Sequence, residues 1–248
     1  MNLRVHKLVK SYHLRPVLDL PEATFGNYAL EGLIGPNGAG KSTLMGLLTR
    51  RIPATTGFIE YETEGKVYDL NTKQAYEVAR LGLVKTNQRI QNFESLTIRE
   101  SLRLAGASAE SETLSAVFRG SETSEACESV IDDYLQRFKF TDPDGFAKSA
   151  GEKKLLDILR CLIVKPRMLL MDEPTAGLPE DVTLQVMDEI TKEVKENNIR
   201  VLIVEHDLDL IWRYCEYVHF LSDGEMLCDG TPDQVRTNDY VAEKYLGV

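Results

Sequence analysis

The sequence predicts an α/β protein that binds a ligand at one edge of a parallel sheet. Three short, largely apolar runs are typical of buried parallel strands: ALEGLI (29–34), MLLM (168–171) and VLIV (201–204). A glycine-rich loop follows the first run, and ionisable residues follow the other two. Because α/β sheets bind ligands at the carboxyl ends of their strands, the pattern indicates both the fold class and the place of the site.

Composition limits the classes of function. The 248 residues are enough for one large domain or two lobes. With 39 acidic and 29 basic residues the net charge is −10, which argues against binding nucleic acid or anionic lipid through bulk charge. No run approaches the ~18 apolar residues of a membrane span, so we expect no direct membrane insertion. Four cysteines without a Cys-x-x-Cys pair are typical of reduced thiols in a cytosolic protein.

The loop GPNGAGKST (35–43) matches the phosphate-binding pattern G-x-x-x-x-G-K-[ST] and precedes a predicted helix, KSTLMGLLTR (41–50). Glycines let the backbone N–H groups turn into one hollow, and the helix N-terminus adds partial positive charge. Lys41 would reach the β- and γ-phosphates, and Ser42 would bind Mg²⁺. The alternative is a glycine-rich turn without a ligand. The expected nucleotide-binding residues are Gly35, Pro36, Asn37, Gly38, Ala39, Gly40, Lys41, Ser42 and Thr43.

Ionisable side chains follow the other two strands. Asp172 ends the run at 168–171 and is expected to hold Mg²⁺, directly or through water. Glu173 comes next and points differently, which suits a carboxylate that orients or polarises the attacking water in phosphoryl transfer. His206 follows the run at 201–204, where an imidazole can hydrogen-bond the γ-phosphate or the water. Taken alone, His206 is more often a structural histidine.

Two further stretches carry polar candidates. Gln88 follows the short apolar run LGLV (81–84), and its amide can bind Mg²⁺ or a water on it; Gln91 is the competing choice. Ser149 precedes an amphipathic helix and is expected to cap it, with Glu152 as the capping-box partner. Such a helix start also exposes N–H groups that can bind phosphate.

In this order, the phosphate loop, Gln88, the Ser149 helix start, Asp172-Glu173 and His206 resemble the ATP-binding subunit of an ABC transporter over essentially the whole chain. The chain looks most similar to the subunits of branched-chain amino acid importers and their urea and lipopolysaccharide-export relatives. The stretches that carry this likeness are GLVKTNQRIQNFESLTIRESL (82–102), LLDILRCLIVKPRMLLMDEPTAGL (155–178), IVEHDLDLI (203–211) and VAEKYLGV (241–248).

The resemblance implies a P-loop NTPase core of the ABC ATPase type, in one domain over 1–248. Residues 1–87 and 166–248 would form the ATP-binding core with an antiparallel β subdomain, and residues 88–165 would form a helical subdomain with the family signature. The serine- and glutamate-rich segment 106–129 is expected to begin as a surface loop. Asp223-Gly224 lies between two apolar runs and predicts a β-hairpin at the sheet edge.

The resemblance also implies roles for single residues, with ATP and Mg²⁺ as cofactors. Tyr12 would stack on adenine, although a lone tyrosine near an N-terminal strand is usually a packing residue. Gln88 would be the switch glutamine that links the nucleotide to the membrane partner. Glu173 would be the catalytic carboxylate and His206 the switch histidine.

Ser149 and Gly151 would belong to the signature that closes over the nucleotide held by a second ATP-binding subunit. The usual signature is Leu-Ser-Gly-Gly-Gln, where this chain has Lys148, Ser149, Ala150, Gly151 and Glu152. Pro179 also stands where the family often has an aspartate. These departures bear on phosphate contact and on communication between two nucleotide sites.

The predicted function is ATP hydrolysis that powers a membrane transporter. The partners would be transmembrane permease subunits and a second ATP-binding subunit, at the cytoplasmic face of the cell membrane. One alternative is a soluble ABC-type ATPase that drives a macromolecular machine without a permease. A generic P-loop kinase is a third class, but it leaves the Ser149 helix start and His206 unexplained.

Overall fold

The computed structural model describes residues 1–13, 15–86, 95–110 and 122–246. Gln88 and Gln91 therefore lie outside the described residues. The chain forms two compact units: unit 1 comprises Met1–Lys85, Arg167–Glu173 and Thr191–Val248, and unit 2 comprises Thr86–Pro166 and Pro174–Ile190. The assignment of the chain to a single domain with the lobes named above stays a prediction.

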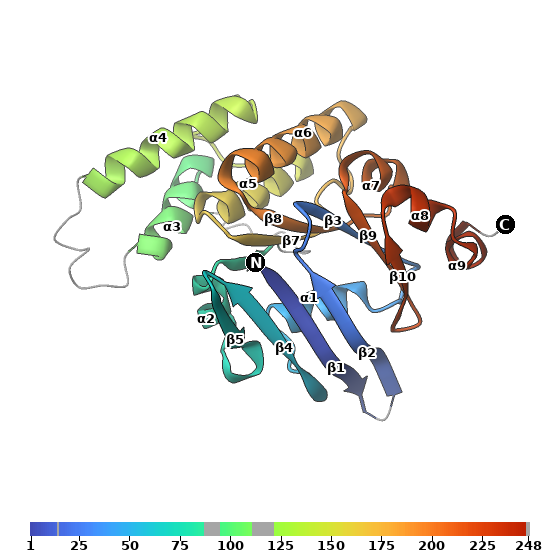
Figure 1. The fold of residues 1–248 in the computed structure, drawn as a ribbon. Coiled ribbons are helices and arrows are strands. Elements are labelled where there is room, and N and C mark those ends of the chain that lie inside the picture. The colour runs from blue at the N-terminus through green and yellow to red at the C-terminus, as the bar shows by residue number, and fades with distance from the viewer. Residues whose placement is uncertain (14, 87–94, 111–121, 247–248) are drawn as a thin grey trace. The chain divides into compact units, whose positions relative to one another are not determined.

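Unit 1 contains an antiparallel sheet, as the resemblance implied. Its strands are β1 (Asn2–Tyr12), β2 (Arg15–Phe25), β4 (Thr56–Thr63) and β5 (Lys66–Asp69), in the order β2-β1-β4-β5 (Figure 1). Leu3 and Val5 on β1 and Ile59 and Tyr61 on β4 are buried, and polar residues stand between them. This alternation is the pattern of a sheet with one face on the core.

The second sheet of unit 1 has six strands. They are β3 (Leu30–Ile34), β6 (Leu83–Lys85), β7 (Met168–Asp172), β8 (Arg200–Val204), β9 (Tyr217–Ser222) and β10 (Glu225–Gly230), in the order β10-β9-β3-β8-β7-β6. Every neighbouring pair is parallel except β9 and β10. All five residues of β3 and of β7 are buried. The three apolar runs are thus confirmed as strands of a parallel sheet. Such strands are buried on both faces, so nearly all of their residues are apolar.

A tight turn at Asp223-Gly224 joins β9 to β10, and β10 is the edge strand, so the predicted hairpin is confirmed. Both turn residues have positive φ, 52° for Asp223 and 85° for Gly224, as a type I′ turn requires.

Helix α1 (Lys41–Leu48) contacts β2 of the antiparallel sheet and β7 of the parallel sheet, so it lies between the two (Figure 1). Leu44, Met45, Leu47 and Leu48 of α1 are buried in one core with residues of both sheets. Unit 1 also contains the last part of α6 (Glu180–Asn197), from Thr191 onward. Its other elements are η1 (Leu70–Thr72), α2 (Ala75–Arg80), α7 (Leu208–Tyr214), α8 (Pro232–Arg236), α9 (Asp239–Val241) and η2 (Ala242–Leu246).

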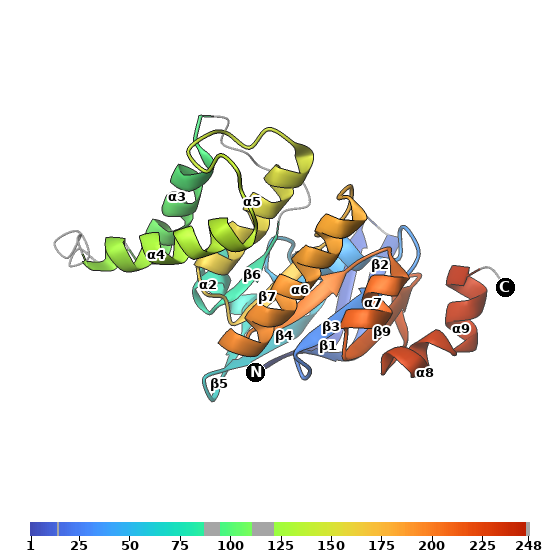
Figure 2. The ribbon, with the colours of Figure 1, turned by 90° about the horizontal axis from the view of Figure 1, so that it is seen from above.

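Unit 2 is helical, as expected. It contains α3 (Ile98–Glu110), α4 (Glu122–Arg137), α5 (Ala150–Ile163) and the first part of α6 (Glu180–Asn197) (Figure 2). Helix α3 packs against α4 and α5. Arg103 of α3 pairs with Glu128 of α4, and Arg160 of α5 donates to the Ser101 hydroxyl of α3 at 2.8 Å. These contacts connect the three helices.

The prediction of a surface loop at the start of segment 106–129 is wrong for residues 106–110. Residues 106–110 continue α3, and residues 111–121 are not described. Two alanines occur within residues 106–110, and alanine has the highest helix propensity, which offsets the serine and glycine content.

Within the described residues, no helix is both long and apolar enough to cross a membrane.

The fold predicts that truncating a core side chain of unit 1 lowers the free energy of unfolding much more than truncating a surface side chain. Leu170 is fully buried in β7, so Leu170→Ala should lower the free energy of unfolding by about 2–5 kcal/mol. Val67 is 55% exposed on β5, so Val67→Ala should change it by about 0.5 kcal/mol or less. Chemical denaturation of both variants tests the prediction, and equal losses would contradict the core described above.

Candidate nucleotide-binding site

The loop that follows β3 has a backbone that glycine alone adopts readily. Gly35 has a φ of 151° and Gly40 a φ of 105°, both in the left-handed region. A Cβ on Gly35 would lie 1.9 Å from the carbonyl oxygen of Leu221 in β9, and a Cβ on Gly40 would lie 3.1 Å from the carbonyl oxygen of Val17 in β2. The glycines therefore serve both the turn and the close packing of the loop on its neighbours.

A main-chain hydrogen bond joins the hairpin turn of β9 and β10 to this loop. The Gly224 amide donates to the carbonyl of Ala39 at 3.1 Å, and the Asp19 amide of β2 donates to the carbonyl of Gly224 at 2.8 Å. Inside the loop, the Ala39 amide donates to the Pro36 carbonyl at 3.2 Å. The loop is thus bonded to the hairpin turn, and the hairpin turn is in turn bonded to β2 of the antiparallel sheet.

Helix α1 begins directly after the loop, and its N-terminus can bind an anion. Gly40 caps the helix without a side-chain hydrogen bond, and the first turn holds no acidic residue. The N–H groups of a helix's first turn have no partner inside the helix and carry partial positive charge. Ser42 is exposed in that turn, and Asn37 and Gly38 are exposed in the loop. This arrangement fits the phosphates of a nucleotide.

Lys41 is buried and lies over the loop. Its Nζ donates to the carbonyls of Gly35 at 2.6 Å and of Pro36 at 3.0 Å. Burial lowers the pKa of Lys41, while the negative charges of Glu173 and Asp172 act in the opposite direction. The ammonium group is therefore close to both the loop and the carboxylates that end β7.

Glu173 and His206 come together at the carboxyl edge of the parallel sheet. The Nε2 atom of His206 lies 3.0 Å from Oε1 of Glu173, and both side chains are partly exposed. The Glu173 amide donates to the Val204 carbonyl at 2.9 Å, which connects β7 to β8. Glu173 has a φ of 51°, a strained conformation for a non-glycine residue that occurs often at functional sites.

Asp172 is buried at the end of β7, and Nζ of Lys85 donates to its Oδ2 at 2.9 Å. We did not single out Lys85, which is the last residue of β6, from the sequence. Its position near Asp172 follows from the pairing of β6 with β7, because parallel neighbours end at the same edge of the sheet, and the strand order is not visible in the sequence.

The other predicted site residues are placed as follows. Tyr12 ends β1 with 46% of its surface exposed, and Nζ of Lys10 lies 4.9 Å from the centre of its ring. Ser149 and Gly151 are in unit 2, so their geometry is described within that unit. Gln88 is outside the described residues.

Ser149 caps helix α5, and the predicted capping box is confirmed. The Glu152 amide donates to Oγ of Ser149 at 3.0 Å, and the Ser149 amide donates to the Glu152 carboxylate at 3.0 Å. The bond from the Ser149 amide is the main reason that the pKa of Glu152 is lowered. The glutamate that replaces the family's usual glutamine thus has a structural role as a charged cap.

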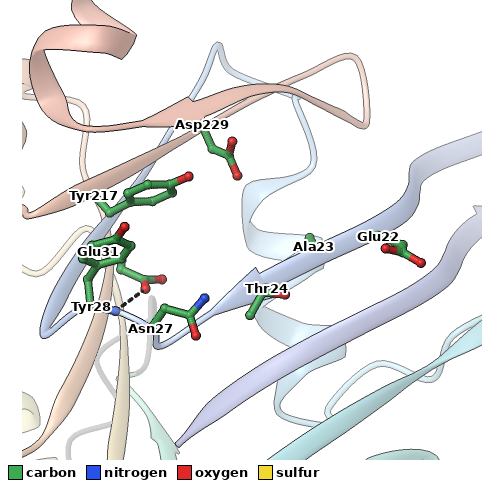
Figure 3. Close-up of a pocket in the computed structure, with 8 residues that line it drawn as sticks. All are labelled: Glu22, Ala23, Thr24, Asn27, Tyr28, Glu31, Tyr217 and Asp229. Atoms are coloured by element: carbon green, nitrogen blue, oxygen red, sulfur yellow. Dashed lines mark hydrogen bonds between the residues drawn. The ribbon is translucent and has the colours of Figure 1, made fainter.

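A separate hollow in unit 1 has the wrong charge for a nucleotide. Its volume is about 320 Å³, and three of its lining residues are carboxylates (Figure 3). The rings of Tyr28 and Tyr217 stack at 4.5 Å, and burial raises the pKa of Tyr217 to about 12. Glu31 accepts a bond from the Tyr28 amide at 2.9 Å. The lining residues are Glu22, Ala23, Thr24, Asn27, Tyr28, Glu31, Tyr217 and Asp229.

The sequence matches the ABC transporter family over residues 22–176, which is more than half of the chain. The chain belongs to the ABC transporter family. As an ATP-binding subunit of this family it binds nucleotide and hydrolyses ATP. Its fold is that of the ABC cassette, with the mixed α/β content that the sequence predicted.

Similar proteins extend this result beyond the matched segment. The high-affinity branched-chain amino acid transport ATP-binding protein BraF of Pseudomonas aeruginosa is 33% identical, over 87% of this chain and 86% of the relative. LivG of Escherichia coli K12, with the same description, is 30% identical over the same shares. A crystal structure described as the ADP conformation of an ATP-binding cassette of an ABC transporter is 27% identical, with a TM-score of 0.80 and complete coverage of both chains.

The bond between the hairpin and the phosphate loop predicts different effects of two turn glycines in this ABC protein. A Cβ on Gly224 would lie 2.6 Å from the Val17 carbonyl oxygen, whereas a Cβ on Gly65, which also has positive φ, would meet no atom within 4 Å. Gly65→Ala should cost about 1 kcal/mol of stability and leave nucleotide affinity unchanged. Gly224→Ala should cost more stability and also weaken nucleotide binding. Titration with a fluorescent nucleotide checks this, and unchanged affinity in Gly224→Ala would refute the proposed support of the loop.

Proposed function

We propose that this chain is the ATP-hydrolysing subunit of an ABC importer of the branched-chain amino acid or a related type. One observation carries the proposal: the phosphate loop, Asp172 and the Glu173–His206 pair lie at the carboxyl ends of neighbouring strands β3, β7 and β8. That edge is where α/β proteins bind nucleotides. The descriptions of BraF and LivG support the importer type.

In the proposed mechanism the loop and Lys41 bind the β- and γ-phosphates, and the ring of Tyr12 stacks on the adenine. Glu173 polarises the water that attacks the γ-phosphate and accepts its proton. His206 holds the Glu173 carboxylate through Nε2, because the two atoms are already within hydrogen-bond distance at 3.0 Å. Glu173 has a left-handed backbone, and its carboxylate contacts His206 whereas that of Asp172 contacts Lys85.

Ser42, Asp172 and Gln88 are the residues that would hold Mg²⁺. The hydroxyl of Ser42 is exposed in the first turn of α1, and the Asp172 carboxylate ends β7, so two hard oxygen donors are available. Mg²⁺ in phosphoryl-transfer sites is usually bound by one or two carboxylates together with phosphate and water. When bound, it would neutralise charge on the β- and γ-phosphates.

The proposed partners are permease subunits and a second ATP-binding subunit, which place the chain at the cytoplasmic face of the membrane. Ser149 and Gly151 would complete the partner's nucleotide site, because the start of α5 presents main-chain N–H groups. The relatives described above are transport proteins, which favours this function over a soluble machine.

The role of Glu173 predicts that Glu173→Gln binds ATP normally but turns it over at least about 10²-fold more slowly, because a general base typically contributes 10²–10⁴. Glu225→Gln, at an exposed position of β10, is the matched control and should keep the parental rate. Phosphate release under single-turnover conditions measures the step. A rate within a few fold of the parent would remove Glu173 from the catalytic role.

The shared-site arrangement predicts that Glu173→Gln forms a dimer with ATP and Mg²⁺ and is monomeric without them. Adding Ser149→Arg should abolish the dimer and spare ATP binding to the monomer, because the bulky side chain would occupy the phosphate position. Ser149→Ala, which loses the cap but adds no bulk, controls for loss of the α5 cap. Sedimentation velocity distinguishes these states, and a monomer under both conditions would count against the shared site.

A further inference from the structure

Lys85 is a largely buried lysine with a defined partner. Its Nζ donates to Oδ2 of Asp172 at 2.9 Å, and only 9% of the Lys85 side chain and none of the Asp172 side chain is exposed. Lysine and aspartate are rarely buried unless they are paired. Strands β6 and β7 are neighbours, so the lysine reaches across the carboxyl edge of the sheet to the last residue of the next strand.

Lys85 differs from the lysine of the phosphate loop in its contacts. Lys41 bonds to the carbonyls of Gly35 and Pro36, whereas Lys85 bonds to the carboxylate proposed to hold Mg²⁺. The other carboxylate at this edge, Glu173, has His206 as its partner. In the structure, Asp172 is therefore hydrogen-bonded to the Lys85 ammonium, and Glu173 to the His206 imidazole.

We propose that Lys85 is an internal counter-cation that competes with Mg²⁺ for Asp172 and so sets the affinity of the nucleotide-loaded site for the divalent cation. This inference rests on the proposed function, in which Asp172 holds Mg²⁺. An ammonium at hydrogen-bond distance neutralises much of the carboxylate charge that attracts a divalent cation. It also repels that cation directly, and burial strengthens both effects because little water screens them.

Lys85 thus acts on the cation through its charge next to Asp172, and the sign of this effect can be measured. If the ammonium merely oriented Asp172 toward Mg²⁺, its removal would weaken cation binding. If it competes, its removal tightens cation binding. The two roles predict opposite changes in one measurable affinity.

The competition also has a consequence for the chain without nucleotide. There the ammonium of Lys85 offsets the buried charge of Asp172, and removing one partner of a buried ion pair leaves the other charge uncompensated. Lys85 therefore stabilises the empty site and lowers the affinity of the loaded one for the cation.

The test measures the affinity of the protein for Mn²⁺, which replaces Mg²⁺ because electron paramagnetic resonance detects it. A non-hydrolysable ATP analogue is present at saturation. Lys85→Met, which removes the charge and keeps the apolar stem, should tighten Mn²⁺ binding at least about tenfold. Lys85→Gln should do the same while keeping a hydrogen-bond donor, and it takes the place of Lys85→Met if that variant fails to fold. Lys85→Arg keeps the charge and should stay within about threefold of the parent. Unchanged or weaker Mn²⁺ binding in the uncharged variants would overturn the competition.

Thermal unfolding without nucleotide or divalent cation gives the second readout. Lys85→Met should lower the midpoint by about 4 °C or more, and this loss should nearly vanish in an Asp172→Asn background, where no charge is left to compensate. An equal loss in both backgrounds would assign the effect to packing of the stem and overturn the pairing. If the parent itself binds no Mn²⁺ with the analogue, the proposed Mg²⁺ site fails; if the parent binds and the uncharged variants match it, the competition alone fails.

Discussion

The contact between the phosphate loop and the β9–β10 hairpin is the constraint on which the rest of the site depends. At Gly35 there is no room for a side chain beside the Leu221 carbonyl, and at Ala39 the loop accepts a hydrogen bond from the hairpin turn. A loop of such flexible residues has high conformational entropy when it is unsupported. Backbone contacts from strands already ordered by the sheet remove that freedom before a ligand arrives.

Parallel strands then bring together residues that are far apart in the chain. Asp172 and Glu173 follow β7 and His206 follows β8, and these two strands pair in register at Asp172 and Val204. Because both strands end at the same edge, Asp172, Glu173 and His206 lie in one site, although each alone could belong to an ordinary turn. The chemistry of this ABC protein is therefore a product of sheet topology as much as of residue type.

Sequence reasoning succeeded where structure is local. The three apolar runs, the loop pattern, the Asp223-Gly224 turn and the Ser149–Glu152 cap each depend on residues only a few positions apart, and each was found. It missed the contact of Lys85 with Asp172, which are 87 positions apart and meet only through the pairing of β6 with β7. It also missed the left-handed backbone of Glu173, because nothing in a glutamate's sequence context signals positive φ.

The partners of Asp172 and Glu173 within the chain affect how fast a nucleotide associates with the site. The whole chain carries a net charge of −10, which by itself would repel a polyanion and slow encounter. At the sheet edge, however, Lys85 pairs with Asp172, His206 is hydrogen-bonded to Glu173, and Lys41 and the start of α1 add positive potential beside them. An approaching nucleotide therefore meets carboxylates that already have partners, and the local repulsion is weaker than the net charge of the chain suggests. Added salt would weaken the long-range repulsion more than these short contacts, so moderate ionic strength should favour association instead of opposing it.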